Sequence, residues 1–117
     1  MKKTLALFLF CIFFFLQGQI GRVGINTMSP KTTLDVSGKT DGSGNLLTND
    51  ITGLQAPRLT RSELTAKGDT LYGTDQKGAL VYITDISAGD TNSQRVNITS
   101  TGYYYFDGSV WVKVERF

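Results

Sequence analysis

The chain has 117 residues, with 12 Lys and Arg, 10 Asp and Glu, no His and one Cys, and its formal net charge is +2 at pH 7. Lys2 and Lys3 account for that surplus, so the rest of the chain has no basic excess that would favour nucleic acid as a partner. Because Cys11 also lies near the N-terminus, the remainder lacks Ser-His and Cys-His nucleophilic pairs and thiolate or imidazole metal sites.

Residues 1–18 have the layout of a secretory signal peptide. Lys2 and Lys3 precede an unbroken apolar run at residues 5–16, which is typical of a cleaved signal. That run is shorter than the roughly 20 residues of a transmembrane helix. We expect cleavage after Gly18, export to the cell surface or the medium, and no membrane span in the mature chain. A retained anchor or a buried helix is the alternative.

Residues 19–54 are predicted to form an extended, glycine-rich segment with short strands and little bulk to bury. Residues 20–25 (IGRVGI) and 32–36 (TTLDV) have strand composition, and Pro30 between them favours a turn. Residues 38–45 (GKTDGSGN) are predicted to be a flexible loop.

Residues 55–117 are predicted to form a small β-rich domain with one short helix. Thr60 and Glu63 match a capping box, in which each side chain accepts the other's backbone N–H, and Gly68 is placed to end the helix. Residues 79–84 (ALVYIT) predict an apolar, central strand. Residues 85–100 are polar and predict either a strand at 95–99 or an exposed excursion.

Residues 102–114 (GYYYFDGSVWVKV) predict a closing β-hairpin. Asp107-Gly108 is typical of a two-residue type I′ turn, which would place Phe106 opposite Ser109. Alternation then assigns two faces: Tyr103, Tyr105, Val110, Val112 and Val114 on one, and Tyr104, Phe106, Trp111 and Lys113 on the other. The predicted fold class is mainly β with one short helix: a small antiparallel sheet that ends in this hairpin, after an extended glycine-rich N-terminal part.

The hairpin aromatics are the candidate contacts for a partner. Tyr103, Tyr104, Tyr105 and Trp111 have flat rings with polar tips, which suit a glycan or a peptide. The same rings would fill the core of a small sheet, and we favour packing as their first role. Glycan or peptide binding by this Tyr/Trp face is the alternative function.

The carboxylates do not predict catalysis or metal binding. Asp41, Asp75 and Asp107 lie in turn contexts, where the side chain bonds its own backbone. Asp85 and Asp90 share a polar segment that lacks the spacing of a calcium-binding loop, so we interpret it as solvated. We therefore predict no enzyme, no catalytic or metal-binding residues and no cofactor.

Two groups of motifs resemble a known class of proteins. Residues 23–38 (VGINTMSPKTTLDVSG) resemble the G-I-x-T-x-x-P…L-D-V-x-G module of secreted and surface proteins of the Bacteroidota and of phage tail-fibre shafts. Residues 56–60 (APRLT), 78–84 (GALVYIT) and 104–113 (YYFDGSVWVK) resemble the P-R-L-T…L-V-Y…Y-F-D-G-x-x-W arrangement of the same class.

This resemblance implies a β-rich extracellular module that is often trimeric. With the signal peptide, it leads us to expect an exported, non-enzymatic structural or adhesion module within a fibre-like or surface assembly. The expected partners are two further copies of the chain and a surface or extracellular protein or glycan. Thr70 is a candidate O-glycosylation site, because Asp69-Thr70-Leu71 resembles the acceptor pattern of Bacteroidota.

Overall fold

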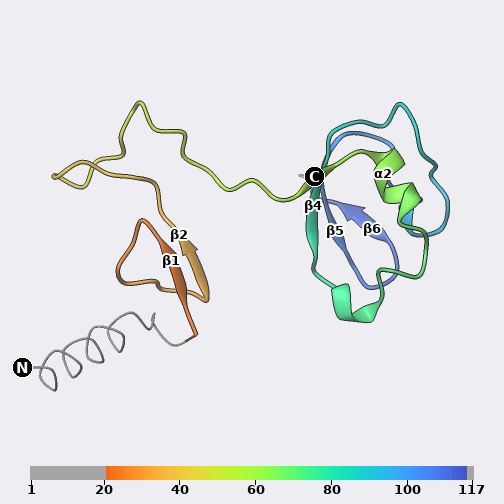
Figure 1. Cartoon of the computed structure of the whole chain (residues 1–117), viewed down its shortest axis with the longest axis horizontal. Coiled ribbons are helices and arrows are strands. Elements are labelled where there is room, and N and C mark those ends of the chain that lie inside the picture. The colour runs from red at the N-terminus through yellow and green to blue at the C-terminus, as the bar shows by residue number, and fades with distance from the viewer. Residues whose placement is uncertain (1–20, 116–117) are drawn as a thin grey trace, which may run out of the picture. The chain divides into compact units, whose positions relative to one another are not determined.

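A computed structural model describes residues 21–115, which divide into two compact units with the boundary in the chain between Leu54 and Gln55 (Figure 1). We call residues 21–54 the first unit and residues 55–115 the second unit. The predicted signal peptide lies outside the described residues. Between residues 21 and 115, no helix has the length and apolar character of a membrane span.

The first unit is built on two short parallel strands. β1 (Val23–Ile25) pairs with β2 (Leu34–Val36), with Val23 opposite Leu34 and Ile25 opposite Val36. Parallel strands are usually joined by a dozen or more residues, but here residues 26–33 suffice. Asn26 makes the sharp exit from β1 possible, since its φ of 58° lies in the left-handed region that Asn tolerates better than most residues.

The glycine-rich stretch 38–45, predicted to be a flexible loop, forms a hydrogen-bonded turn. The Asp41 carboxylate accepts the N–H groups of Ser43 and Asn45 at 2.8 and 3.0 Å. These bonds stabilise the ionised form and lower the pKa of Asp41. The turn-forming role predicted for Asp41 is thus confirmed.

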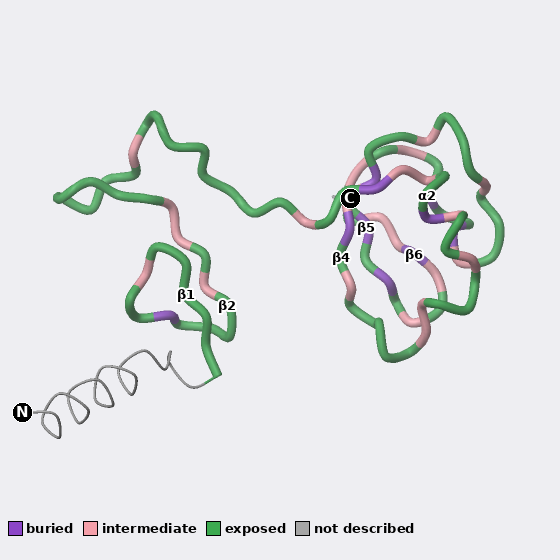
Figure 2. Tube along the Cα trace, in the orientation of Figure 1, coloured by how far each residue is buried: buried purple, intermediate pink, exposed green. Residues whose placement is uncertain are grey.

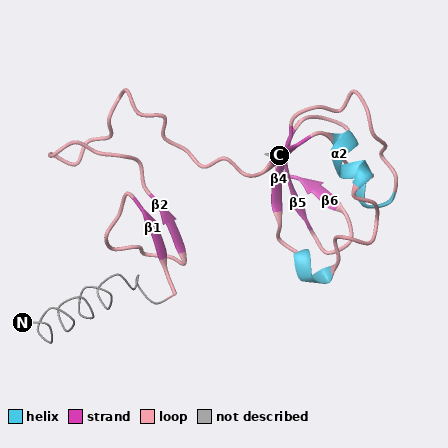
Figure 3. Ribbon diagram, viewed as in Figure 1, coloured by secondary structure: helices cyan, strands magenta, loops and turns pink. Residues whose placement is uncertain are grey.

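The second unit contains a four-stranded mixed sheet in the order β3-β4-β5-β6. Figure 3 labels three of its strands, β4, β5 and β6. The strands are β3 (Arg58–Leu59), β4 (Leu80–Ile83), β5 (Gly102–Phe106) and β6 (Trp111–Lys113). β4, β5 and β6 pair antiparallel, whereas β3 pairs parallel to β4. The predicted mainly β fold with one short helix is confirmed, and the parallel β3-β4 pair is an addition to the expected antiparallel sheet.

The predicted helix is α2 (Arg61–Ala66), and its capping box is confirmed. The Thr60 hydroxyl accepts the Glu63 N–H at 3.0 Å, and the Glu63 carboxylate accepts the Thr60 N–H at 2.9 Å. That second bond lowers the pKa of Glu63. Gly68 follows the helix with a φ of 76°, which suits a C-terminal cap. The helix directs Leu64 into the core.

One face of this sheet forms the hydrophobic core with α2 (Figure 2). Trp111 lies at its centre, with ring centroids 5.1 Å from Phe106 and 5.0 Å from Tyr72. Fully burying an apolar side chain of this size contributes about 1.5–3 kcal/mol. The buried hydrophobic residues are Leu59, Leu64, Val81, Ile83, Ile98, Tyr104, Phe106 and Trp111.

The hairpin is confirmed, but its predicted register is wrong by two residues. Phe106 pairs with Trp111, not Ser109, so the loop is longer than Asp107-Gly108. The reason is the Asp107 carboxylate, which accepts the N–H groups of Ser109 and Val110, both at 2.8 Å, and closes the longer loop. A shift of two residues keeps the paired strand residues on their predicted faces, whereas Val110 lies in the loop.

Of the two alternatives predicted for residues 85–100, the strand at 95–99 is wrong, whereas most of the segment is exposed as the second alternative expected. It contains the 3-10 turn η2 (Ser93–Arg95) and buries Ile98 in the core. Arg61 donates to the carbonyls of Ile86, Ala88 and Ile98, and these bonds hold the segment against α2. Buried Arg95 pairs with Asp90 and Asp69 at 2.8 and 2.9 Å, so its charge is neutralised from two sides.

Candidate partner-binding surfaces

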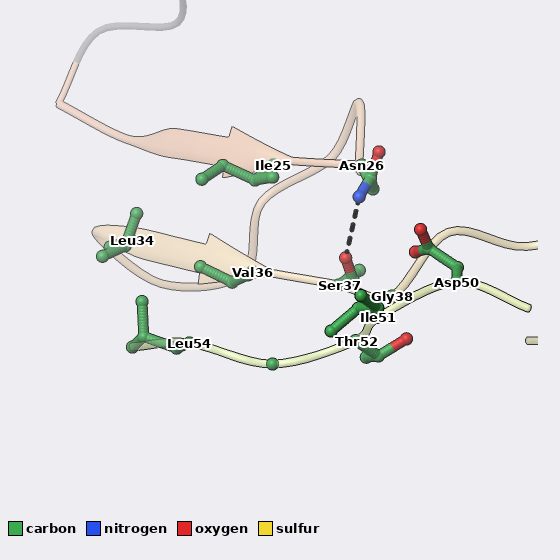
Figure 4. Close-up of a pocket in the computed structure, with 11 residues that line it drawn as sticks. Ile25, Asn26, Leu34, Val36, Ser37, Gly38, Asp50, Ile51, Thr52 and Leu54 are labelled. Carbon is green, nitrogen blue, oxygen red and sulfur yellow. Dashed lines mark hydrogen bonds between the residues drawn. The ribbon is translucent and has the colours of Figure 1, made fainter. Parts of the chain in front are cut away.

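The first unit presents an open surface that we call the apolar groove, lined by Ile25, Leu34, Val36, Ile51 and Leu54 (Figure 4). The β1-β2 register places Val23 and Ile25 beside Leu34 and Val36 on one face of the strand pair. Residues 51–54 run alongside and form the other wall, and the groove encloses about 380 Å³.

The apolar side chains of this groove are not covered within the first unit. The four strand residues are between 36% and 58% exposed, and Ile51 is 99% exposed. Among residues 21–54, all of which the structure describes, only Pro30 is buried. An exposed cluster of branched aliphatic side chains is typical of a surface that contacts another molecule.

The opposite face of β1 and β2 is closed by the connection between them. A Cβ atom at Gly24 would lie 2.7 Å from the Thr27 carbonyl oxygen, so only glycine permits this contact. The Asp35 carboxylate accepts the Lys31 N–H at 2.9 Å, and Arg22 donates to the Pro30 carbonyl at 3.3 Å. The unit is therefore closed on its glycine and carboxylate side and open on its aliphatic side.

Close packing at Gly38 positions the second wall of the groove. A Cβ atom there would lie 2.5 Å from Leu46 Cδ2 and 2.9 Å from Thr52 Cγ2. At the same end, the Asn26 amide donates to the Ser37 carbonyl at 3.2 Å (Figure 4). The groove thus has an aliphatic floor and a polar end.

The second unit presents a different open surface, the tyrosine face, on the side of its sheet away from the core. It consists of Arg58, Leu80, Tyr82, Tyr103 and Tyr105, which the strand register places side by side. The rings of Tyr82 and Tyr103 meet edge to face at 4.8 Å and 78°. With Gln55, Ala56 and Arg58 they line a hollow of about 350 Å³.

The sheet separates the four aromatic residues predicted as partner contacts. Tyr104 and Trp111 are fully buried, and the Tyr104 hydroxyl donates to the Ser100 carbonyl at 2.7 Å. Tyr103 and Tyr105 lie on the tyrosine face and are 38% and 40% exposed. Of these four residues, only Tyr103 and Tyr105 are accessible to a partner in this structure. Tyr104 and Trp111 have the packing role that we favoured from the sequence.

Thr70, the candidate O-glycosylation site, lies in an exposed bend after α2. The preceding Asp69 carboxylate accepts a hydrogen bond from Arg95 at 2.9 Å. The residues that sequence reasoning missed are Tyr82 and Arg58 of the tyrosine face and the aliphatic residues of the groove. Alternation in residues 79–84 already placed Tyr82 opposite Val81 and Ile83, which was the available signal.

The carboxylates of the second unit serve local structure. Hydrogen bonds from Arg95 lower the pKa of Asp90, and hydrogen bonds from Ser87 lower the pKa of Asp85. In the part of the chain that the structure describes, no cluster of three or more His, Cys, Asp or Glu side chains could hold a metal ion. The chemistry offered by both surfaces is apolar and aromatic contact.

A protein family described as the phage tail-like trimerisation region matches the chain over residues 24–116. The match includes the strand pair of the first unit except Val23, and the whole sheet of the second. No curated protein and no solved structure matches the chain significantly.

Proposed function

The chain belongs to the phage tail-like trimerisation region family, and we propose that it is an exported structural module that assembles as a homotrimer in a fibre-like or surface assembly. The observation that supports this most is the uncovered apolar groove of the first unit. In this proposal the protein acts by assembly and contact, without catalysis.

Physical reasoning about the strand pair supports a partner. Parallel sheets are normally covered on both faces, and a two-stranded sheet alone is at best marginally stable in water. β1 and β2 are such a pair, with one face covered by its own connection and the other exposed. A surrounding assembly supplies the missing cover.

The mass of the native protein tests this assembly. We expect native mass spectrometry of the exported chain to give three times the mass of one mature subunit. A strict monomer at micromolar concentration would contradict the trimer. The mass of the denatured subunit reports whether residues 1–18 have been removed. Recovery of the full-length chain only from the cytoplasm would contradict export.

The tyrosine face supports a second candidate, an adhesion role through a glycan or an extracellular peptide. The Tyr82–Tyr103 pair beside Arg58 combines flat apolar surface with hydrogen-bond donors, and the hollow between them is open. A glycan array is the direct test. Tyr103→Ala should abolish any signal while the fold is retained, and Thr99→Ala, another exposed position, should leave it unchanged.

A further inference from the structure

We propose that the apolar groove is the surface through which three copies of this chain meet, with the strand faces of Ile25, Leu34 and Val36 turned toward a common threefold axis. We further infer that residues 21–54 are stable in their fold only within that assembly, whereas residues 55–115 fold within each subunit. The inference rests on the proposed homotrimer and assigns its interface.

The internal roles of the motif residues lead to this assignment. In G-I-x-T-x-x-P…L-D-V-x-G, Gly24 allows the close approach of Thr27, and Pro30 is buried. Asp35 accepts the Lys31 N–H, and Gly38 admits Leu46 and Thr52. Each of these positions is explained by a contact within the first unit.

The three aliphatic positions of the motif have no comparable explanation inside the unit. Ile25, Leu34 and Val36 project together from one face and stay substantially exposed. Branched aliphatic side chains are stabilised by removal from water, not by exposure to it. Their cover must therefore come from outside residues 21–54.

Copies of the chain fit this face better than an unrelated partner does. The family match names trimerisation, and a closed threefold arrangement presents the same face of each subunit to the axis. Aliphatic side chains at the axis bring no like charges together. The polar residues Asn26, Ser37 and Asp50 lie at one end of the groove, where they form a rim (Figure 4).

The tyrosine face is the competing surface, and the internal core of the second unit argues against it. Eight hydrophobic residues are buried there without any partner, so the sheet does not need its open face covered in order to fold. That face also carries Arg58 and tyrosine hydroxyls, which remain hydrated at little cost. The first unit has no such core.

A matched pair of substitutions in the exported chain separates the two surfaces. Ile25→Asp places a charge in the groove, and Leu80→Asp places the same charge on the tyrosine face at a position of similar exposure. We expect Ile25→Asp to lower the native mass threefold and Leu80→Asp to leave it unchanged. Trp111 is the only tryptophan, so its fluorescence reports whether the second unit stays folded.

Cross-linking through single cysteines tests the same geometry without relying on dissociation. Cys11 is the only natural cysteine and lies within residues 1–18, so an introduced cysteine is unique in the mature chain. With a short trifunctional maleimide, Ile25→Cys should give covalent trimers, and Leu80→Cys should stay monomeric on a denaturing gel.

The outcomes distinguish this inference from the function on which it rests. A wild-type chain that is monomeric by native mass contradicts the homotrimer itself. A trimer that survives both Ile25→Asp and Leu34→Asp, or that is cross-linked through Leu80→Cys alone, leaves the homotrimer in place and overturns the interface assigned to the groove.

Discussion

The two units of this protein differ in whether they bury their own apolar side chains. The second unit packs a helix and a polar segment onto one face of a sheet and encloses Trp111, Tyr104 and Phe106 completely. The first unit closes around glycine, proline and hydrogen bonds, and it leaves its aliphatic side chains outside. One region carries its own hydrophobic core, and the other leaves its aliphatic side chains uncovered.

This difference shows that exposed apolar residues have different meanings in different settings. On the tyrosine face, ring edges and hydroxyls lie above a sheet that is already stable. In the groove, Ile25, Leu34 and Val36 are the main apolar bulk of two strands that have no hydrophobic core of their own. The same degree of exposure is tolerable in the first case and destabilising in the second.

Separating the two units should produce the largest effect. We expect a fragment of residues 55–117 to fold as a monomer, with dispersed amide resonances and a cooperative thermal transition. A fragment of residues 19–54 at low micromolar concentration should give the circular dichroism of a random coil, because Pro30 is the only buried residue among the described residues 21–54. Sheet signal in that fragment as a monomer would contradict the comparison.

Trp111 tests the core of the second unit. Trp111→Ala should lower the free energy of unfolding by about 3–5 kcal/mol, because it empties the space between Tyr72 and Phe106. Trp111→Phe should cost less, since the buried indole N–H has no hydrogen-bond partner among the described residues. Urea titration followed by far-ultraviolet circular dichroism measures both values. Equal losses for the two variants would contradict this expectation, because they would show that the phenylalanine ring does not fill the space between Tyr72 and Phe106.

Two glycines sharpen the contrast between the units. A Cβ atom at Gly89 would lie 2.7 Å from backbone atoms of Arg61 and Ser62, and its φ of 80° disfavours other residues. Gly89→Ala should destabilise the second unit by about 1–3 kcal/mol, and Gly24→Ala should weaken the proposed trimer instead.

Gly42→Ala is the matched control for both, since a Cβ atom there meets nothing within 4 Å. Differential scanning calorimetry with native mass spectrometry separates the two effects. If Gly24→Ala and Gly89→Ala shifted the same transition, the units would not be independent.

The smallest expected effect concerns the loss of stability at low pH. Hydrogen bonds from Val110 and Ser109 lower the pKa of Asp107 in the hairpin loop. A folded-state pKa below the unfolded one means that the stabilisation is complete above the unfolded value, about 3.9, and is lost as the pH falls through the folded value. Asp107→Asn should therefore flatten the pH dependence of stability below about pH 4, measured by thermal unfolding. A slope as steep as that of the wild type would exclude this role.

The sequence allowed us to predict those features of the fold that depend on residues close together in the chain. The capping box needs only Thr60 and Glu63, three positions apart, and the structure has both of its hydrogen bonds. Side-chain alternation placed Tyr104, Phe106 and Trp111 on one face and Tyr103 and Tyr105 on the other. The register was missed because Asp-Gly favours a two-residue turn, while the Asp107 side chain closes a longer loop here.

The features that could not be predicted depend on contacts between residues that are far apart in the sequence. Residues 85–100 look like a free loop because much of what orders them is distant in sequence. Arg61 donates to carbonyls of this segment from α2, and Arg95 pairs with Asp69 before it. The groove was missed for a similar reason. The sequence around Gly38 does not reveal that Leu46 and Thr52 pack against it and bring residues 51–54 beside β2.

The arginine contacts of the second unit also bear on its resistance to proteases. A polar, sixteen-residue connection is ordinarily where secreted proteases cut first. Trypsin-like enzymes need an arginine or lysine side chain to enter their own pocket. In this connection the only such side chain is Arg95, which is buried against two carboxylates. Arg61 of α2, which holds the connection, donates hydrogen bonds to three of its carbonyl groups. Arg95, the only residue of this connection that a trypsin-like enzyme would recognise, is thus also the residue whose ion pairs hold the connection in place.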